Sequence, residues 1–259
     1  MKVTLPRVVH AEWTKLRALR STWIVLGTTV MLVVGLAAAT GWSQHRDIVA
    51  HGTSLSTADA AGGAFLGIDL FVLVIGVFGV LLMTGEYGSG LIRATLAAVP
   101  RRLSVLLAKA TVLIMVTAPV MLVACLAALF VSQAFLGADG ASLGDPGVLR
   151  AALGAAAAPV AVGLLGLGIG AVLRHTAAAI TTLVAALLVL PALMPVALPR
   201  AARDAVLPYL PTTSSQAMYA LDDGNPFKTL SPGAGAVVLA LWVVVVLAGA
   251  AAVLLRRDA

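Results

Sequence analysis

Two short patterns in this 259-residue chain contain residue types that could carry chemistry. His45, Asp47 and His51 offer two imidazoles and a carboxylate, which are ligand types for a transition metal. Residues 140–144, Gly-Ala-Ser-Leu-Gly, have the spacing of a hydrolase nucleophile turn. That turn needs a preceding strand, and a metal site needs supporting partners, whereas both patterns fall in segments expected to be polar loops. We therefore expect no catalytic residue and no metal site here.

The lysines give no sign of a nucleotide-hydrolysing site. A phosphate-binding loop ends in Gly-Lys-Ser/Thr, and none of Lys2, Lys15, Lys109 and Lys228 follows a glycine. The longest segment between the apolar stretches, residues 199–233, is too short for a soluble domain. Any ATP hydrolysis is therefore expected on another chain.

Asp69 is the one formally charged residue within an expected membrane span. An acid inside a membrane is costly and tends to face a cavity or a partner, which makes Asp69 a candidate for a substrate path. Alternatively, a small shift of the span places Asp69 at the membrane interface, where its charge costs little. The pattern leaves both interpretations open.

The residues discussed above lie within or between six apolar stretches of about 20 residues. Each stretch is long enough to cross about 30 Å of hydrocarbon. The chain is 61% hydrophobic and only 11% charged, against about 25% charged in a soluble domain. Continuous rather than alternating apolar runs favour helices over a barrel. We predict an all-α integral membrane protein, forming one permease domain over residues 1–259, with spans at about 23–42, 64–85, 110–131, 152–173, 176–198 and 234–254.

Lysine and arginine placement predicts the orientation. With both termini in the cytoplasm, 12 basic residues fall inside and 5 outside, so the net charge of +6 indicates topology rather than nucleic-acid binding. The long polar lead before the first span favours a retained span over a cleaved signal peptide. The outer basic residues are Arg46, Arg150, Arg200, Arg203 and Lys228, and the inner ones are Lys2, Arg7, Lys15, Arg17, Arg20, Arg93, Arg101, Arg102, Lys109, Arg174, Arg256 and Arg257.

Two cytoplasmic segments show helical patterns. Residues 1–22 place Val8, Glu12 and Leu16 at helical spacing, which predicts an amphipathic helix in the membrane interface. Residues 86–104 combine a glycine-rich turn, a short apolar stripe and Pro100, which predicts a short helix along the inner surface. The alternatives are a disordered basic tail for the first segment and a loop anchored by positive charge for the second.

Glycine and proline mark two of the spans. Gly166 and Gly170 in the fourth span lie four residues apart, a spacing that permits close helix approach. Pro191 and Pro195 are expected to kink the fifth span. The outer segment that follows is expected to stay irregular and can dip back into the membrane, because it contains Pro199, Pro208, Pro211, Pro226 and Pro232.

Four segments, in this order and spacing, resemble permease subunits of ABC-2 type exporters from bacteria. They are residues 12–17 (Glu-Trp-Thr-Lys-Leu-Arg) leading to 20–23, residues 85–87 (Gly-Glu-Tyr) with 92–96 (Ile-Arg-Ala-Thr-Leu), residues 209–218, and residues 254–258.

The resemblance implies a six-span permease in the bacterial plasma membrane. It would work as a homodimer or heterodimer among membrane lipids, with an ABC ATPase subunit that binds ATP and Mg. The helix after the second span would contact that ATPase, with Glu86, Tyr87, Gly90, Arg93 and Thr95 at or beside the contact. The small residues 88–89 depart from the family's usual larger polar residue at this turn.

The sequence therefore predicts the permease subunit of an ATP-driven exporter, with no cofactor of its own. A stand-alone secondary transporter and a membrane-embedded enzyme are the alternatives. Carriers usually show intramembrane charges, and here only Asp69 is available. No cluster of His, Asp or Glu lies within the spans, which disfavours the enzyme.

Overall fold

The computed structural model describes residues 4–52, 54–99, 102–221 and 230–256, and every regular element in these ranges is helical. Six of the helical stretches are long and apolar enough to cross a membrane, which confirms the predicted all-α fold with six spans. These stretches are Arg20–His51, Thr57–Gly88, Arg102–Asp139, Val148–Leu173, Thr176–Ala197 and Pro232–Arg256.

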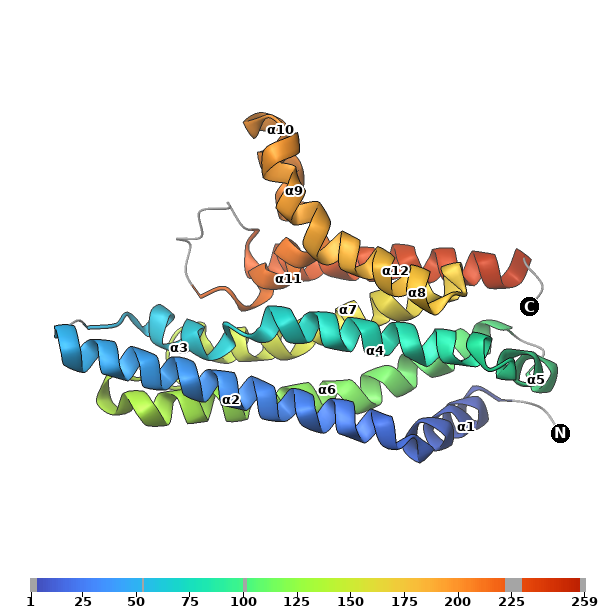
Figure 1. Cartoon of the computed structure of the whole chain (residues 1–259), viewed down its shortest axis with the longest axis horizontal. Helices are drawn as coiled ribbons and strands as arrows, with labels where there is room; N and C mark the ends of the chain where they lie inside the picture. The colour runs from blue at the N-terminus through green and yellow to red at the C-terminus, as the bar shows by residue number, and fades with distance from the viewer. Residues whose placement is uncertain (1–3, 53, 100–101, 222–229, 257–259) are drawn as a thin grey trace.

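The elements form a bundle whose long helices run side by side along one axis (Figure 1). In chain order they are α1 (Leu5–Ala18), α2 (Arg20–His51), α3 (Thr57–Phe65), α4 (Ile68–Gly88), α5 (Leu91–Ala98), α6 (Arg102–Leu136), η1 (Gly137–Asp139), α7 (Val148–Leu173), α8 (Thr176–Val184), η2 (Ala185–Val189), α9 (Leu190–Ala197), α10 (Arg200–Val206), η3 (Leu207–Tyr209), α11 (Pro211–Tyr219) and α12 (Pro232–Arg256).

Different helices lie at the two ends of the bundle. α1, α5 and the last turns of α12 gather at one end, which we call the α5 end, and α3 lies near the other, the α3 end (Figure 1). Among the charges that predict orientation, Lys2, Arg101, Lys228 and Arg257 lie outside the described residues. Which end faces the cytoplasm therefore stays a prediction.

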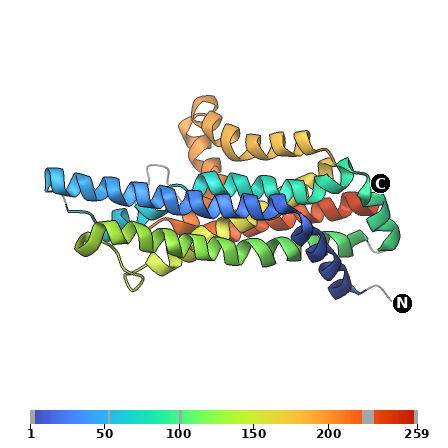
Figure 2. The same cartoon turned by 60° about the horizontal axis from the view of Figure 1, so that its bottom comes forward.

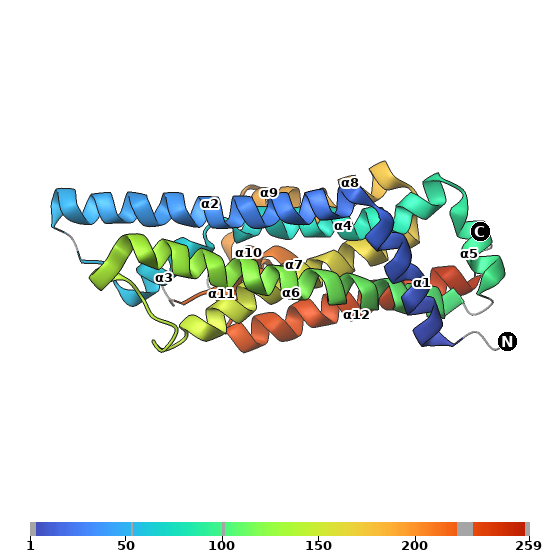
Figure 3. The same ribbon diagram turned by 90° about the horizontal axis from the view of Figure 1, so that it is seen from below.

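Helix α2 is longer than a span needs to be. At about 1.5 Å per residue its 32 residues extend about 48 Å, against about 30 Å of hydrocarbon. The predicted span at 23–42 therefore marks only the apolar part, and the helix continues through its polar residues to His51. Helix α6, with 35 residues, is extended in the same way and packs along α2 (Figure 3).

Helix α1 is separate from α2, although the sequence predicted one amphipathic element over residues 1–22. It ends at Ala18, and Leu19 is extended before α2 begins at Arg20. The break lets α1 turn across the end of the bundle (Figures 2 and 3). Its buried face consists of Val8, Glu12 and Leu16, at the predicted helical spacing, and it packs against α6.

Helix α7 is the centre of the bundle, with 67% of its most apolar window buried, against 22% in α12. Its glycines make this possible. A Cβ added at Gly163 would lie 3.1 Å from the side chain of Ile75 on α4, and one at Gly166 would clash with the carbonyl oxygen of Gly76. The packing face predicted for the fourth span from Gly166 and Gly170 is therefore confirmed.

The fifth span is broken where its sequence contains proline. A π-helical turn, Ala185–Val189, precedes Pro191, whose missing N–H deprives the Leu187 carbonyl of an α-helical donor. The Thr212 hydroxyl on α11 donates to that carbonyl instead, at 2.6 Å. Beyond the break, α9 and α10 point away from the bundle (Figure 1).

The prediction that the outer segment is irregular was wrong, because most of the described part of 199–233 is helical. Pro199, Pro208, Pro211 and Pro232 each stand at or next to the first residue of a helical element, where a missing N–H costs nothing. Pro226 lies outside the described residues.

Helix α11 returns to the bundle and packs against α7 and α12. Its Ser214, Ser215 and Ala217 are fully buried. The Arg150 guanidinium on α7 donates to the carbonyls of Met218, at 3.1 Å, and Ala220, at 2.6 Å, which satisfies acceptors at the end of α11.

Candidate functional site

Four charged side chains from three helices meet at the α5 end. Glu12 and Lys15 lie one turn apart on α1 and therefore share a face, Glu86 lies in the last turn of α4, and Lys109 lies two turns into α6. We call these four residues the ion cluster.

Within the ion cluster each lysine contacts both carboxylates. The Lys109 Nζ lies 2.7 Å from the Glu12 Oε2 and 2.8 Å from the Glu86 Oε1. The Lys15 Nζ lies 2.7 Å from the Glu12 Oε1 and 2.8 Å from the same Glu86 Oε1. The cluster thus alternates in sign around a closed ring and has no net formal charge.

Three members of the ion cluster are buried: Lys109 is 1% exposed, Glu12 3% and Glu86 8%. Charges at such sites are tolerated only when they are paired, because an isolated buried ion loses its hydration without compensation. The arrangement therefore ties α1, α4 and α6 together. Moving α4 or α6 away would leave an unbalanced charge behind, and moving α1 away would take one of the two carboxylates from the buried Lys109.

The third N–H of each lysine is also occupied. Lys109 donates to the Leu82 carbonyl at 3.3 Å, and Lys15 donates to the Thr95 hydroxyl oxygen on α5 at 3.2 Å. Burial alone would lower the pKa of Lys15, but its hydrogen bonds to Glu12 and Glu86 and their charges raise that pKa above its usual value. The Lys15 ammonium therefore stays charged at neutral pH and connects α5 to the cluster.

The residues predicted for the ATPase contact fall at this end. Glu86 and Thr95 both contact Lys15. Gly90 is the N-cap residue of α5 and has a φ of 73°, a left-handed conformation that favours glycine. Tyr87 lies under the Arg174 guanidinium, which is 5.5 Å from its ring centroid. Arg93 belongs to α5, but its side chain lies outside what the structure describes.

Asp69, the candidate for a substrate path, is at the opposite end of α4 from Glu86, about 26 Å away along the helix axis. The Tyr219 hydroxyl donates to its Oδ1 at 2.6 Å, and the Gln216 amide donates to its Oδ2 at 3.1 Å. Burial and the charge of Asp69 raise the pKa of Tyr219 well above its usual value, which keeps the phenol protonated as a donor. Asp69 thus fastens α11 to α4.

Sequence reasoning missed Glu12, Lys15 and Lys109 as members of a site. A signal was present for Glu12, since an acid on the apolar face of an amphipathic helix needs a buried partner. The neighbours of Lys109 in sequence, Ala108 and Ala110, are both apolar, which places this lysine at a buried helix position.

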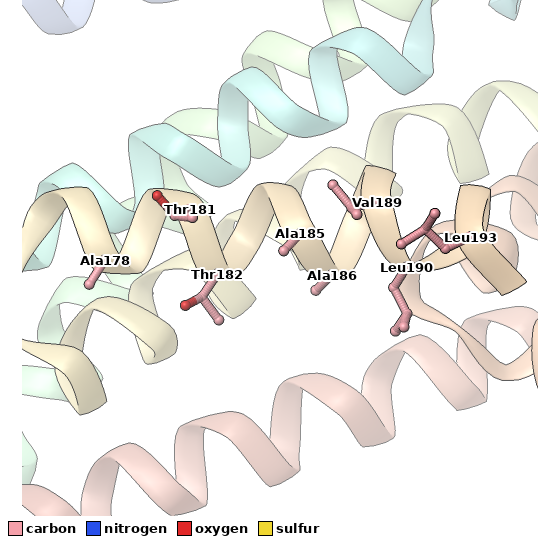
Figure 4. Close-up of a pocket in the computed structure, with 8 residues that line it drawn as sticks. All are labelled: Ala178, Thr181, Thr182, Ala185, Ala186, Val189, Leu190 and Leu193. Atoms are coloured by element: carbon pink, nitrogen blue, oxygen red, sulfur yellow. The ribbon is translucent and has the colours of Figure 1, made fainter. Parts of the chain in front are cut away.

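A second feature is a groove of about 700 Å³ along α8, η2 and α9 (Figure 4). Small and aliphatic side chains line it, and Thr182, Ala186 and Leu190 project from one side of the segment. Only 17% of this span's most apolar window is buried within the chain. The face is therefore free to contact lipid, substrate or another protein.

The histidines of α2 do not assemble a metal site. His51 and Asp47 are joined only through a contact of 3.2 Å between the His51 Nδ1 and the Asp47 backbone carbonyl. Across the described ranges, no three His, Cys, Asp or Glu side chains lie close enough together to hold a metal ion.

Two comparisons with known proteins bear on this geometry. The family model described as ABC-2 family transporter protein matches residues 8–210, which include the whole ion cluster and α5. A search of curated proteins found no match to the chain.

Proposed function

The chain belongs to the ABC-2 family of transporter proteins, and we propose that it is the permease of an ATP-driven exporter whose ATP is hydrolysed by a separate subunit. Membership makes it a multi-pass membrane component of an ABC transporter that is not itself catalytic. The proposal adds the direction of transport, the coupling to the ATPase through α5, and the bacterial plasma membrane with both termini in the cytoplasm.

The observation that carries the proposal is the bond between α5 and the ion cluster. Helix α5 is joined to α4 by a short glycine-containing turn, and Lys15 links its Thr95 to Glu12 and Glu86. A displacement of α5 by a docked ATPase would therefore act on α1, α4 and α6 together. Glu86, Tyr87, Gly90, Arg93 and Thr95 would lie at or beside the docked surface.

The path from α5 into the bundle is stiff. The backbones of α4 and α7 touch at their glycines, where a Cβ at Gly79 would clash with the carbonyl oxygen of Gly163. Because no flexible side chain lies between the two helices there, α7 would follow a movement of α4. ATP and Mg bound by the ATPase would thus change the spacing of the spans without touching this chain.

The sparsely covered face of α8 and α9 would accommodate a second permease copy. The Thr182, Ala186 and Leu190 side of this segment bears mostly small side chains, which allow close helix approach or leave space for a substrate between two copies. We propose that the dimer, of identical or different chains, places its substrate path along this groove. Asp69 would lie beside the outer end of that path.

The two alternative functions have less support. A secondary carrier needs an intramembrane ion site, and both oxygens of Asp69 already accept hydrogen bonds from Tyr219 and Gln216. A membrane enzyme needs a reactive group that is available to a substrate, whereas the lysines and glutamates of the ion cluster are engaged in ion pairs with one another.

Copurification tests the proposal. The tagged permease, extracted from its native membrane in a mild detergent, should retain a chain with a phosphate-binding loop in roughly equal amount. ATP hydrolysis should require that chain and be absent from the permease alone. Purified permease that hydrolyses ATP, or that has no such partner after crosslinking in intact membranes, would overturn the proposal.

A further inference from the structure

The ion cluster forms one wall of a cavity of about 510 Å³ at the α5 end. The remaining walls are mainly leucine side chains from α1, α4 and α5. Three of the lining leucines, Leu19 between α1 and α2, Leu81 on α4 and Leu91 on α5, are 54%, 46% and 58% exposed. The cavity therefore combines an apolar mouth with charged groups, and its volume is in the range that holds a small organic molecule.

The donors and acceptors of the ion cluster do not balance. An ammonium has three N–H groups. Lys15 directs its three to Glu12, Glu86 and Thr95, and Lys109 directs its three to Glu12, Glu86 and the Leu82 carbonyl. Both lysines are therefore fully occupied and have no donor to offer a ligand.

One acceptor is left over. Both Glu12 oxygens and the Glu86 Oε1 receive lysine N–H groups, whereas the buried Glu86 Oε2 has no hydrogen-bond partner among the described residues. Glu86 lines the cavity, and a donor bound beside it could bond to this oxygen while the Oε1 keeps both lysine contacts. The missing component is a hydrogen-bond donor.

We propose that this cavity binds an amphipathic amine, whose ammonium donates to Glu86 and whose apolar body lies among Leu19, Leu81 and Leu91. An ammonium is favoured over a neutral donor because a bond between two ionised groups is stronger. An anion is disfavoured because every lysine N–H in the cluster is already used. On the proposed function, which this step extends, the cavity is where the exporter takes its substrate from the inner leaflet.

Binding to the purified full-length permease in phosphatidylcholine nanodiscs tests the inference. The probe is a decyl chain with a dansyl group at one end and a primary ammonium at the other. Saturable binding above that of empty nanodiscs is expected. A trimethylammonium analogue, which keeps the charge but has no N–H, and a carboxylate analogue should each bind at least about tenfold more weakly. Equal binding of the carboxylate analogue would overturn the proposal.

Two variants locate the site. Gly85 lines the cavity, and a Cβ added there meets nothing within 4 Å, so the side chain of Gly85→Leu has room to enter the cavity and take up its space while all four charges of the ion cluster are kept. Glu86→Gln removes the charge that attracts the ammonium. Both should weaken probe binding about tenfold or more. Gly249→Leu on α12 is the matched control, because its Cβ also meets nothing within 4 Å, and it should bind as the wild type does.

Unchanged binding by Gly85→Leu would overturn the proposed site. Phosphatidylethanolamine is a second source of a primary ammonium, and nanodiscs that contain it provide the comparison. Loss of probe binding in them would make the cavity a lipid site and overturn its assignment to substrate. None of these measurements uses the ATPase, so a failure here leaves the coupling proposal standing, and a failure of copurification leaves binding unaffected.

Discussion

Glu12 and Lys109 are 97 residues apart in the chain, yet the Glu12 Oε2 and the Lys109 Nζ lie 2.7 Å apart inside the helix bundle. Each is nearly unexposed, so neither could remain charged there alone. This pair holds α1 against the first turns of α6.

Replacing Lys109 with methionine should destabilise the permease strongly. The change keeps most of the side-chain volume but leaves Glu12 and Glu86 to share Lys15, and breaking a buried pair costs about 3 to 5 kcal/mol. Thermal unfolding in detergent measures the loss. The double variant Glu12→Gln with Lys109→Met restores a neutral cluster and should recover part of the stability, and additive losses would contradict the proposed pairing.

Glu86→Gln and Arg93→Ala should each weaken coupling. Glu86→Gln should also lower membrane abundance, because it leaves Lys15 and Lys109 to share Glu12, so coupling is expressed per amount of permease in the membrane. Loss of a charge-assisted bond reduces coupling about ten- to a hundredfold, whereas Thr95→Val, which removes only the hydroxyl that Lys15 contacts, should have a smaller effect. The readouts are the amount of ATPase retained and the hydrolysis rate of the complex. Arg17→Ala removes a basic residue of α1 outside the cluster and serves as the control. Normal coupling in both charge variants would refute the role of α5.

The sequence predicted the number of spans because bilayer thickness fixes how long an apolar helix must be. It also predicted the face of α1, since the period of Val8, Glu12 and Leu16 is local. It could not predict which buried lysine neutralises Glu12, because that depends on how α1 and α6 cross. Proline misled the prediction for 199–233, since the same residue that interrupts a helix also begins one.

The contacts of the predicted site residues could be anticipated only in part. The resemblance implied that Glu86 and Thr95 lie at or beside an ATPase contact, which stays a prediction. The structure shows that Lys15 contacts both of them, and no sequence pattern indicated this link. Asp69 was predicted either to line a path or to sit at the interface. Its bonds to Tyr219 and Gln216 depend on the return of α11, which hydropathy does not reveal.

Gly166→Ala should destabilise the bundle, because its Cβ would meet the carbonyl oxygen of Gly76 and backbone cannot move aside as a flexible side chain can. Overpacking of this kind costs about 1 to 3 kcal/mol. Gly27→Ala is the control, since a Cβ there meets nothing within 4 Å and alanine favours the helix. Unfolding temperatures of the two variants should move in opposite directions, and equal temperatures would disagree with the close contact.

Thiol labelling can establish the orientation, because the sole native cysteine, Cys125, is fully buried. An impermeant reagent applied to intact cells should label Ser54→Cys and Asp204→Cys, and should label Ser89→Cys only after permeabilisation. Thr213→Cys, which lies in the predicted outer segment, should stay unlabelled because Thr213 is 8% exposed on α11. Labelling of Ser89→Cys in intact cells would reverse the predicted topology.

Tyr219→Phe tests the bond that fastens α11 to α4 and predicts a definite pH dependence. Burial and the charge of Asp69 raise the pKa of the folded Tyr219 well above 10.0, so this group's stabilisation is fully present below about pH 10. As the pH rises above that value, the unfolded chain loses the phenol proton first, and the stabilisation declines until the folded pKa is reached. The difference in unfolding temperature between wild type and Tyr219→Phe should therefore be constant from pH 7 to about pH 9 and shrink at higher pH.

Tyr209→Phe is the control for the loss of a phenol. Tyr209 is half-exposed and its hydroxyl makes no described hydrogen bond, so this variant should change the unfolding temperature little. A Tyr219→Phe difference that stays constant beyond pH 10 would show that the hydroxyl does not hold α11 through Asp69.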